Sequence, residues 1–383
     1  MDTKPKKDAF ILSGGGARAA YQLGVLKYIF TEMNYQPEAP IFVGTSAGAI
    51  NAFYLAMRAD AGLDKAILEL CELWSNLTVS RIYKTDVWSV LKTIGNFAYN
   101  FTLGPYVKQR HVESILDTTP LYFFLRKIFD SQLHRLHENI EKGKISALGI
   151  NAMQYGTGKN FTFYEASPDG DIRPWVRHKR EGRPTKLRLK HVLASAAIPL
   201  LFPSVKIGNY FYGDGSVRRM APLSPAIQLG ASRILAIGLR ADHFKSRATE
   251  SYPPVSQIVG MMFNTIFLDA LDHDVHTLER LNGLLEKAPH VKGLRPIAVK
   301  LIQPTQDLGL LSLPYKKFIP RSLSFLVKGL GPMDQRGADF LSYILFEGHY
   351  AELLIKQGFE DAHAQGNELK TFFSCPNPQK KVA

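Results

Sequence analysis

The sequence predicts an α/β fold with a mostly parallel central sheet, because two strand–turn–helix units follow one another near its start. The apolar run "AFILSG" (residues 9–14) leads into three glycines, after which apolar residues recur at near-helical spacing. A second unit has a buried strand at 41–43, a turn at 44–48 and a helix rich in small residues. Successive units of this kind favour parallel strands covered by helices.

Later segments extend this organisation. Further strands are expected at "ISALGINAM" (145–153), "NFTFYEA" (160–166), "NYFYGDG" (209–215), "RILAIGL" (233–239) and "RPIAVKLIQP" (295–304). Helical patterns rich in aromatic residues fill 64–145, and a mainly helical region runs from 241 to 383. We therefore expect a domain at 9–240, with a helical insert at 64–145, followed by the C-terminal region 241–383.

Composition limits the classes of protein that fit. The 383 residues carry a formal charge of +13, so the surface attracts anions. The only two cysteines, Cys71 and Cys375, give no disulfide framework and no Cys-rich metal site, and no signal peptide or 20-residue apolar run is found. We expect a cytoplasmic protein that needs no metal or cofactor. No zinc-finger spacing or nucleic-acid motif accompanies the charge, so we expect no nucleic-acid partner.

The glycine-rich turn at 13–16 admits several kinds of ligand. Gly14, Gly16 and Ala19 satisfy the loose dinucleotide pattern G-x-G-x-x-G/A. That pattern requires an acid at the end of the second strand, where this chain has "GTSAG" instead. The G-K-[ST] sequence of a triphosphate loop is also missing after Gly14. The turn is therefore expected to serve another chemistry.

"GTSAG", residues 44–48, matches the G-x-S-x-G pattern of a nucleophile elbow. Small flanking residues permit the strained strand-to-helix turn that exposes a serine hydroxyl, and both the strand and the helix are present around Ser46. The alternative is a serine that only caps the helix. We favour a nucleophile at Ser46.

A serine nucleophile needs a base within hydrogen-bond reach. Asp214 directly follows an aromatic strand and lies between Gly213 and Gly215, although an ordinary Asp-Gly hairpin turn has the same sequence. A Ser-Asp-His triad would instead use a late histidine. The candidates for that role are His243, His273, His276 and His349.

Four blocks in this order resemble the patatin-like phospholipases, lipid acyl hydrolases with a Ser-Asp dyad. "GGGARAAYQLGVL" is similar to the family's oxyanion block, "GTSAG" to its nucleophile elbow, "ASAAIPLLFPSV" (194–205) to the segment before the base strand, and "DGS" to its D-G-G/A/S motif. The likeness spans about residues 9–240. It implies a three-layer patatin-like sandwich.

The resemblance also implies a role for each site residue. Ser46 would attack the ester carbonyl, and Asp214 would accept its proton and later activate water. Backbone N–H groups of Gly14, Gly15 and Gly16 would stabilise the oxyanion. Arg18 would belong to the same oxyanion block and steady its loop or its negative charge.

We expect a phospholipid or another acyl ester as substrate. The insert 64–145 is either an ordinary helical layer or a lid or acyl-chain groove, and Arg218 and Arg219 are candidates to attract a phosphate, although both are equally explained as surface charges. The basic segment 173–190, with eight Lys or Arg against Glu181, predicts peripheral contact with an anionic membrane, at its inner face.

Two alternatives stay open at this level. One is a triad carboxylesterase or thioesterase, and the other is a non-catalytic patatin-like membrane-binding module. The sequence does not indicate an oligomeric state.

Overall fold

The computed structural model of the protein describes residues 7–84 and 114–374, together with Gly95 and Tyr99, apart from short gaps. The gaps fall at residues 169, 171, 219–220, 242–251, 289–290, 292, 322–323, 325–328 and 333. Most of 85–113, which belongs to the expected helical insert, therefore lies outside the described residues. So do two residues singled out above, Arg219 and His243.

The described residues form one mixed sheet of ten strands in the order β10-β9-β1-β2-β3-β4-β6-β5, with β8 pairing with β3 and β7 pairing with β8. All neighbours from β10 to β3 are parallel, whereas β4 and β8 each run antiparallel to β3. The strands are β1 Asp8–Leu12, β2 Ile41–Thr45, β3 Ala147–Gln154, β4 Asn160–Ala166, β5 Trp175–Arg177, β6 Arg180–Pro184, β7 Val205–Ile207, β8 Tyr210–Asp214, β9 Arg233–Ile237 and β10 Ala298–Ile302. The predicted α/β fold with a mostly parallel sheet is confirmed.

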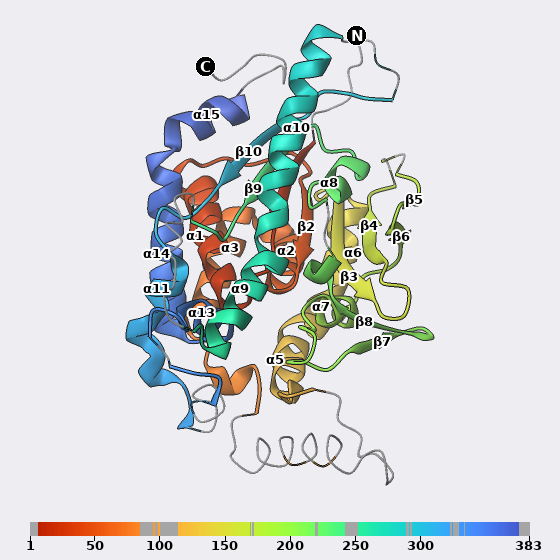
Figure 1. Ribbon diagram of the computed structural model, residues 1–383. Helices are drawn as coiled ribbons and strands as arrows, with labels where there is room; N and C mark the ends of the chain where they lie inside the picture. Colours follow the sequence, from red (N-terminus) through yellow and green to blue (C-terminus); the bar gives the residue numbers. More distant parts are fainter. Residues whose placement is uncertain are drawn as a thin grey trace.

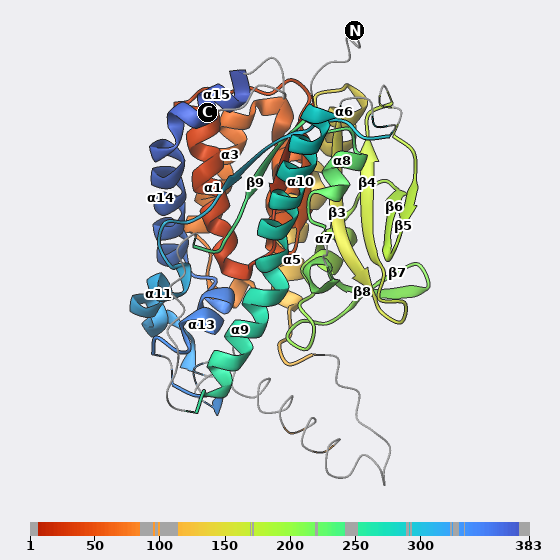
Figure 2. The same ribbon diagram turned by 45° about the horizontal axis from the view of Figure 1, so that its top comes forward.

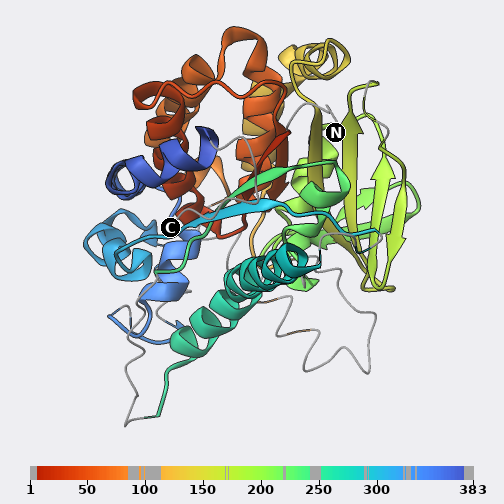
Figure 3. The same cartoon turned by 90° about the horizontal axis from the view of Figure 1, so that it is seen from above.

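Helices cover both faces of this sheet (Figures 1 and 3). Because side chains alternate along a strand, Phe10 and Leu12 of β1 enter one apolar core while Ala9 and Ile11 enter the other. The helices used below are α1 Ala20–Lys27, α2 Ala47–Arg58, α3 Leu63–Ser75, α5 Thr119–Phe129, α6 Leu133–Glu141, α7 Leu189–Ser195, α8 Ser224–Gln228, α9 Val255–Phe267, α10 Asp269–Lys287, α11 Leu308–Ser312, α13 Ala338–Ile344, α14 Gly348–Ala364 and α15 Gly366–Ser374. None of the described helices is long and apolar enough to cross a membrane.

The C-terminal helices pack directly onto the N-terminal half. Helix α14 lies along α1 (Figure 2), and the two backbones meet at glycines. A Cβ on Gly358 would lie 2.1 Å from the Tyr21 carbonyl oxygen, and one on Gly24 would lie 1.9 Å from that of Ile355. No side chain fits there, so these two glycines permit the close helix crossing. Strand β10 extends the sheet beside β9.

Arg18 connects the first turn of the chain to α9 and α13. It lies in the short 3-10 helix Gly16–Ala19 and is 3% exposed. Its Nε donates to Ser342 Oγ at 2.7 Å, its Nη2 pairs with Asp339 Oδ1 at 2.7 Å, and Nη1 donates to Asn264 Oδ1 at 3.2 Å. Burial alone would lower the pKa of Arg18, but nearby Tyr343 and the Asp339 carboxylate outweigh it and raise that pKa. The charge is therefore retained in the interior.

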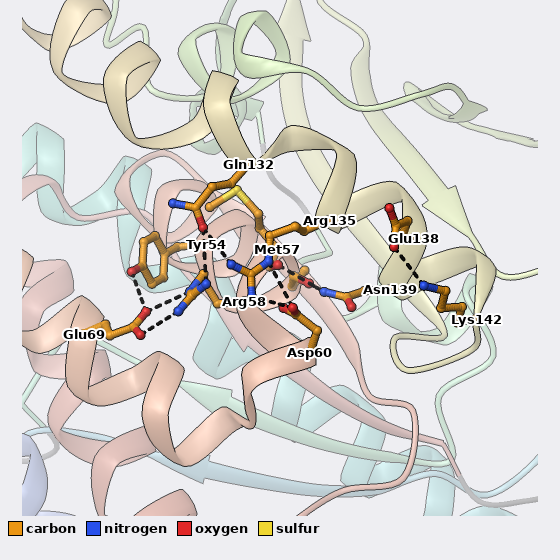
Figure 4. Close-up of polar contacts among 11 residues, drawn as sticks. Tyr54, Met57, Arg58, Asp60, Glu69, Gln132, Arg135, Glu138, Asn139 and Lys142 are labelled. Carbon is orange, nitrogen blue, oxygen red and sulfur yellow. Dashed lines mark hydrogen bonds and ion pairs between the residues drawn. The ribbon is translucent and has the colours of Figure 1, made fainter.

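A second polar cluster fastens α6, and the 3-10 helix Asp130–Gln132 that precedes it, to α2 and α3 (Figure 4). Arg58 donates two hydrogen bonds to Glu69, at 2.8 and 2.6 Å, and a third to Gln132 Oε1 at 3.2 Å. Hydrogen bonds from Arg58 hold the pKa of Glu69 below its usual value. Arg135 pairs with Asp60. These contacts hold three helices of one layer in a fixed arrangement.

Replacing Arg18 should destabilise the whole fold, since Asp339, Ser342 and Asn264 would lose their common partner. We expect Arg18→Met to lower the free energy of unfolding by about 3 kcal/mol. Arg336→Met is the matched control, because the Arg336–Asp334 pair is 40% and 46% exposed and should contribute less than about 1 kcal/mol. Urea unfolding followed by circular dichroism measures both, and equal effects would refute the anchoring role.

Candidate active site

Ser46 lies at a sharp turn between β2 and α2. Its backbone has φ 56° and ψ −131°, which a non-glycine residue rarely adopts. The flanking glycines make this turn possible, because a Cβ on Gly44 would lie 2.5 Å from the Ala49 Cα and one on Gly48 would lie 2.2 Å from the Leu12 carbonyl oxygen. The Ser46 side chain makes no capping hydrogen bond to α2. The geometry is that of a strained elbow that presents the hydroxyl.

Ser195, which belongs to the "ASAAIPLLFPSV" block, holds the elbow in place through two hydrogen bonds. Its Oγ accepts the Ser46 N–H at 2.9 Å and donates to the Asn151 carbonyl at 2.6 Å. Asn151 lies on β3 and also donates from Nδ2 to Thr45 Oγ1 at 2.9 Å. These buried bonds fix Ser46 relative to β3. Neither Ser195 nor Asn151 could be singled out from the sequence, because a single buried polar residue in a helix or strand leaves no pattern of its own.

Asp214 ends β8, which pairs with the same edge of β3 as β2 does, because β4 occupies the other edge. Asn151 of β3 is opposite Thr45 of β2, and the next residue, Ala152, is opposite Asp214. Strands β2 and β8 therefore follow one another along this edge of β3, and Ser46 is the residue directly after Thr45. The register thus brings both residues to the same edge of the sheet.

Asp214 is fully buried and does not belong to a hairpin turn. Its backbone N–H donates to the Ala197 carbonyl at 2.9 Å, and its Oδ1 accepts the Ser216 N–H at 2.8 Å. The chain continues from Asp214 into a 3-10 helix, Gly215–Arg218. A Cβ on Gly215 would lie 2.3 Å from the Asn151 carbonyl oxygen, so this position tolerates glycine alone.

The glycine turn lies directly against the elbow. A Cβ on Gly14 would lie 2.9 Å from the Ser46 Cβ and 2.5 Å from the Ser216 Oγ. Gly16 has φ +56°, and a Cβ there would lie 2.1 Å from the Tyr343 carbonyl oxygen. On Gly15, a Cβ would meet the Leu239 side chain at 2.5 Å. Because Gly14 has no Cβ, the backbone of the turn approaches Ser46 more closely than another residue at this position would allow. Arg18 points away from this site, toward α9 and α13.

Ser216 is the last residue of the "DGS" block, and the motif assigned no role to it. It is 3% exposed, and its Oγ has no hydrogen-bond partner among the described residues. The hydroxyl and the Ser46 side chain both lie against Gly14. A buried hydroxyl without a hydrogen bond costs free energy. The Ser216 hydroxyl, beside the strained Ser46, is therefore available to form a hydrogen bond with a ligand.

An apolar cavity opens from Ser46 and Gly16. Its empty space, including the part open to solvent, is about 670 Å³. The wall comes from α2, α3, α5 and the segment after α7, and polar groups are few. The lining residues are Gly16, Ser46, Ala47, Ile50, Tyr54, Leu70, Leu73, Trp74, Leu77, Ile82, Leu121, Phe124, Leu125, Ile128, Phe129, Ala196, Ile198, Phe202 and Phe346. Most of them lie on α3, on α5 and in the short segment after α3, so the described part of the insert 64–145 forms much of the wall.

Buried side chains connect the cavity wall to the glycine turn. Trp74 Nε1 donates to Asn51 Oδ1 at 3.0 Å, and Asn51 Nδ2 donates to Gln22 Oε1 at 3.1 Å. Gln22 Nε2 in turn donates to the Ser13 carbonyl at 2.8 Å. The turn and the wall are thus held as one unit.

The late histidines lie elsewhere. His273, His276 and His349 are exposed, with His276 close to Glu279 and His349 close to Glu347. His191 is buried in α7, where burial lowers its pKa to about 4 and its Nδ1 accepts the Arg188 N–H. None of these four lines the apolar cavity. Within the described ranges, no group of three His, Cys, Asp or Glu side chains could hold a metal ion.

Comparison with known proteins identifies the family. The family model "Patatin-like phospholipase" matches residues 10–227, more than half of the chain. A viral relative, "Probable lipid hydrolase 463L" of Invertebrate iridescent virus 6, is 27% identical over 230 residues, which are 59% of this chain and 65% of the relative, just under two thirds of its length. The crystal structure of VipD from Legionella pneumophila aligns with 95% of this chain and 67% of its own, at 13% identity and a TM-score of 0.33. The chain belongs to the patatin-like phospholipase family.

Proposed function

We propose that the protein is a lipid acyl hydrolase of the phospholipase A type, working through a Ser46–Asp214 dyad. One observation carries the proposal: Ser46 occupies a strained elbow against the Gly14 turn and lines a large apolar cavity. The family match and the viral lipid hydrolase support hydrolysis of lipid esters. The exposed positions of the described late histidines favour the dyad over a triad.

The proposed reaction assigns one step to each of these groups. Asp214 takes the proton of Ser46 Oγ while that oxygen attacks the acyl carbonyl carbon. Backbone N–H groups of Gly14, Gly15 and Gly16 stabilise the tetrahedral oxyanion. The ester oxygen leaves with the proton from Asp214. Asp214 then takes a proton from water, which attacks the acyl-enzyme, and the fatty acid leaves as the Ser46 hydroxyl is restored.

The cavity accounts for a lipid substrate. Its lining is almost entirely apolar, and burying each CH₂ group of an acyl chain contributes about 0.8 kcal/mol. The acyl chain would extend from Ser46 between α2, α3 and α5. Peripheral contact with an anionic membrane through the basic segment 173–190 stays a prediction.

Removing either dyad residue should abolish turnover. We expect Ser46→Ala and Asp214→Asn each to lower kcat for fatty acid release from phosphatidylcholine vesicles by at least about 1,000-fold. Ser80→Ala, at an exposed serine, is the matched control and should keep full activity. Undiminished release by Ser46→Ala would end the proposal.

Ser216 should affect catalysis without supporting the fold. We infer that its hydroxyl adds a side-chain donor to the oxyanion, so Ser216→Ala should lower kcat by about 100-fold with KM within about twofold. The fold loses no hydrogen bond among the described residues, so the melting temperature should stay level or rise. Unchanged kcat would refute the role, and a fall in melting temperature would indicate a structural one.

Filling the cavity should shorten the preferred acyl chain. Leu125 on α5 lines the cavity, whereas Phe123 on the same helix is 57% exposed and lies outside it. Leu125→Trp should lower kcat/KM for a 16-carbon p-nitrophenyl ester by about tenfold, the loss of roughly two buried CH₂ groups, and leave a 4-carbon ester unaffected. Phe123→Trp should change neither. An unaltered chain-length profile in Leu125→Trp would show that acyl chains bind elsewhere.

A further inference from the structure

A second, polar cavity lies on the opposite face of the sheet from α7. Thr162 and Asn151 line it, whereas their neighbours Phe161 and Phe163 point into the core on the other face. Its empty space is about 330 Å³, including the part open to solvent. The wall is built from β3, β4, the β5–β6 hairpin, the 3-10 helix Gly215–Arg218 and α8, which Figure 1 shows beside β3. The lining residues are Asn151, Asn160, Thr162, Trp175, Arg180, Arg218, Ala221, Ser224 and Pro225.

Two guanidinium groups, those of Arg180 and Arg218, border this cavity. Arg180 begins β6 and is half-buried, while Arg218 is exposed and reaches Gly158, where a Cβ would lie 2.2 Å from its Nη1. Within the described part of the chain, neither arginine forms an ion pair. The acid of the hairpin, Glu181, is already paired with Arg183 at 2.8 Å and with Lys159 at 3.8 Å. The residue opposite Arg180 on β5 is another cation, Arg177.

From this arrangement we infer that the cavity binds a phosphate group. Like charges held together repel each other, and an anion between them relieves that repulsion. Guanidinium groups form strong, charge-assisted hydrogen bonds to phosphate oxygens, and the Ser224 hydroxyl in the wall is a further donor. The shared chemistry is a phosphate that is either free in solution or carried as a phosphomonoester headgroup on a lipid surface. This cavity shares no lining residue with the apolar cavity at Ser46, so the two sites are separate.

The phosphate site touches the turn that carries Asp214. Arg218 is the last residue of the 3-10 helix that begins directly after Asp214. Asn160, in the floor of the cavity, donates from Nδ2 to the Gly215 carbonyl at 2.7 Å. An anion held by Arg218 therefore restrains the same turn and keeps Asp214 oriented toward Ser46. This regulatory part of the inference rests on the proposed function, whereas phosphate binding itself does not.

Calorimetry on the full chain tests binding, in a Ser46→Ala background that prevents turnover. Inorganic phosphate at constant ionic strength should bind saturably, and Arg180→Gln and Arg218→Gln should each weaken binding by about tenfold or more. Arg183→Gln is the matched control, since it removes the same charge from the same strand but lies outside the cavity lining; its affinity should stay within about twofold of the parent.

Vesicles of phosphatidylcholine containing phosphatidic acid supply the lipid arm. Binding of free phosphate would assign the site to a soluble anion, and binding of these vesicles alone would assign it to a lipid headgroup. In either case the Arg180 and Arg218 variants should lose the binding and Arg183→Gln should keep it. The site is refuted if the Arg180 and Arg218 variants bind both phosphate and these vesicles as tightly as Arg183→Gln does.

Turnover tests the regulatory link separately. In the wild type, phosphate should raise fatty acid release from phosphatidylcholine at least twofold, and Arg218→Gln should not respond. Equal rates with and without phosphate in an active wild type would refute the link. A wild type that binds phosphate but never hydrolyses lipid would refute the proposed function and leave the binding site standing.

Discussion

The close approach of two glycine turns is the constraint on which the rest of the site depends. A Cβ on Gly48 would lie 2.2 Å from the Leu12 carbonyl oxygen, and one on Gly14 would lie 2.9 Å from the Ser46 Cβ. Only bare backbone can come this near, and bare backbone provides N–H groups beside the serine. The strain at Ser46, with φ 56°, persists because Ser195 and the strands around it hold the elbow in place.

The C-terminal region contributes to this arrangement from outside the matched family segment. Arg18 ties the glycine turn to Asp339 and Ser342 of α13, and the Tyr343 carbonyl lies against Gly16. The turn is therefore held between the sheet and helices that begin far along the chain. The cluster around Arg58 joins α2 to α3, and both helices contribute to the wall of the apolar cavity. It also joins α2 to the 3-10 helix Asp130–Gln132, which directly follows α5.

The sequence predicted the local features of the fold and site but not their tertiary partners. Alternating strand, turn and helix gave the parallel sheet, and "GTSAG" and "DGS" indicated Ser46 and Asp214, because glycines at a strained turn leave a pattern along the chain. The ion pair of Arg18 with Asp339 leaves none, because it joins distant segments. The Ser216 hydroxyl, which has no hydrogen-bond partner among the described residues, leaves none either. The antiparallel pairing of β4 and β8 with β3 could not be predicted either, because it depends on contacts between segments and not on any one short stretch.

Mass spectrometry after reaction with a fluorophosphonate tests most directly whether Asp214 activates Ser46. The reagent modifies an activated serine hydroxyl and leaves an ordinary one intact. The account predicts that the adduct forms on Ser46 in the wild type and forms at least about 100-fold more slowly in Asp214→Asn. An adduct on another residue, or equal rates in the two proteins, would contradict it.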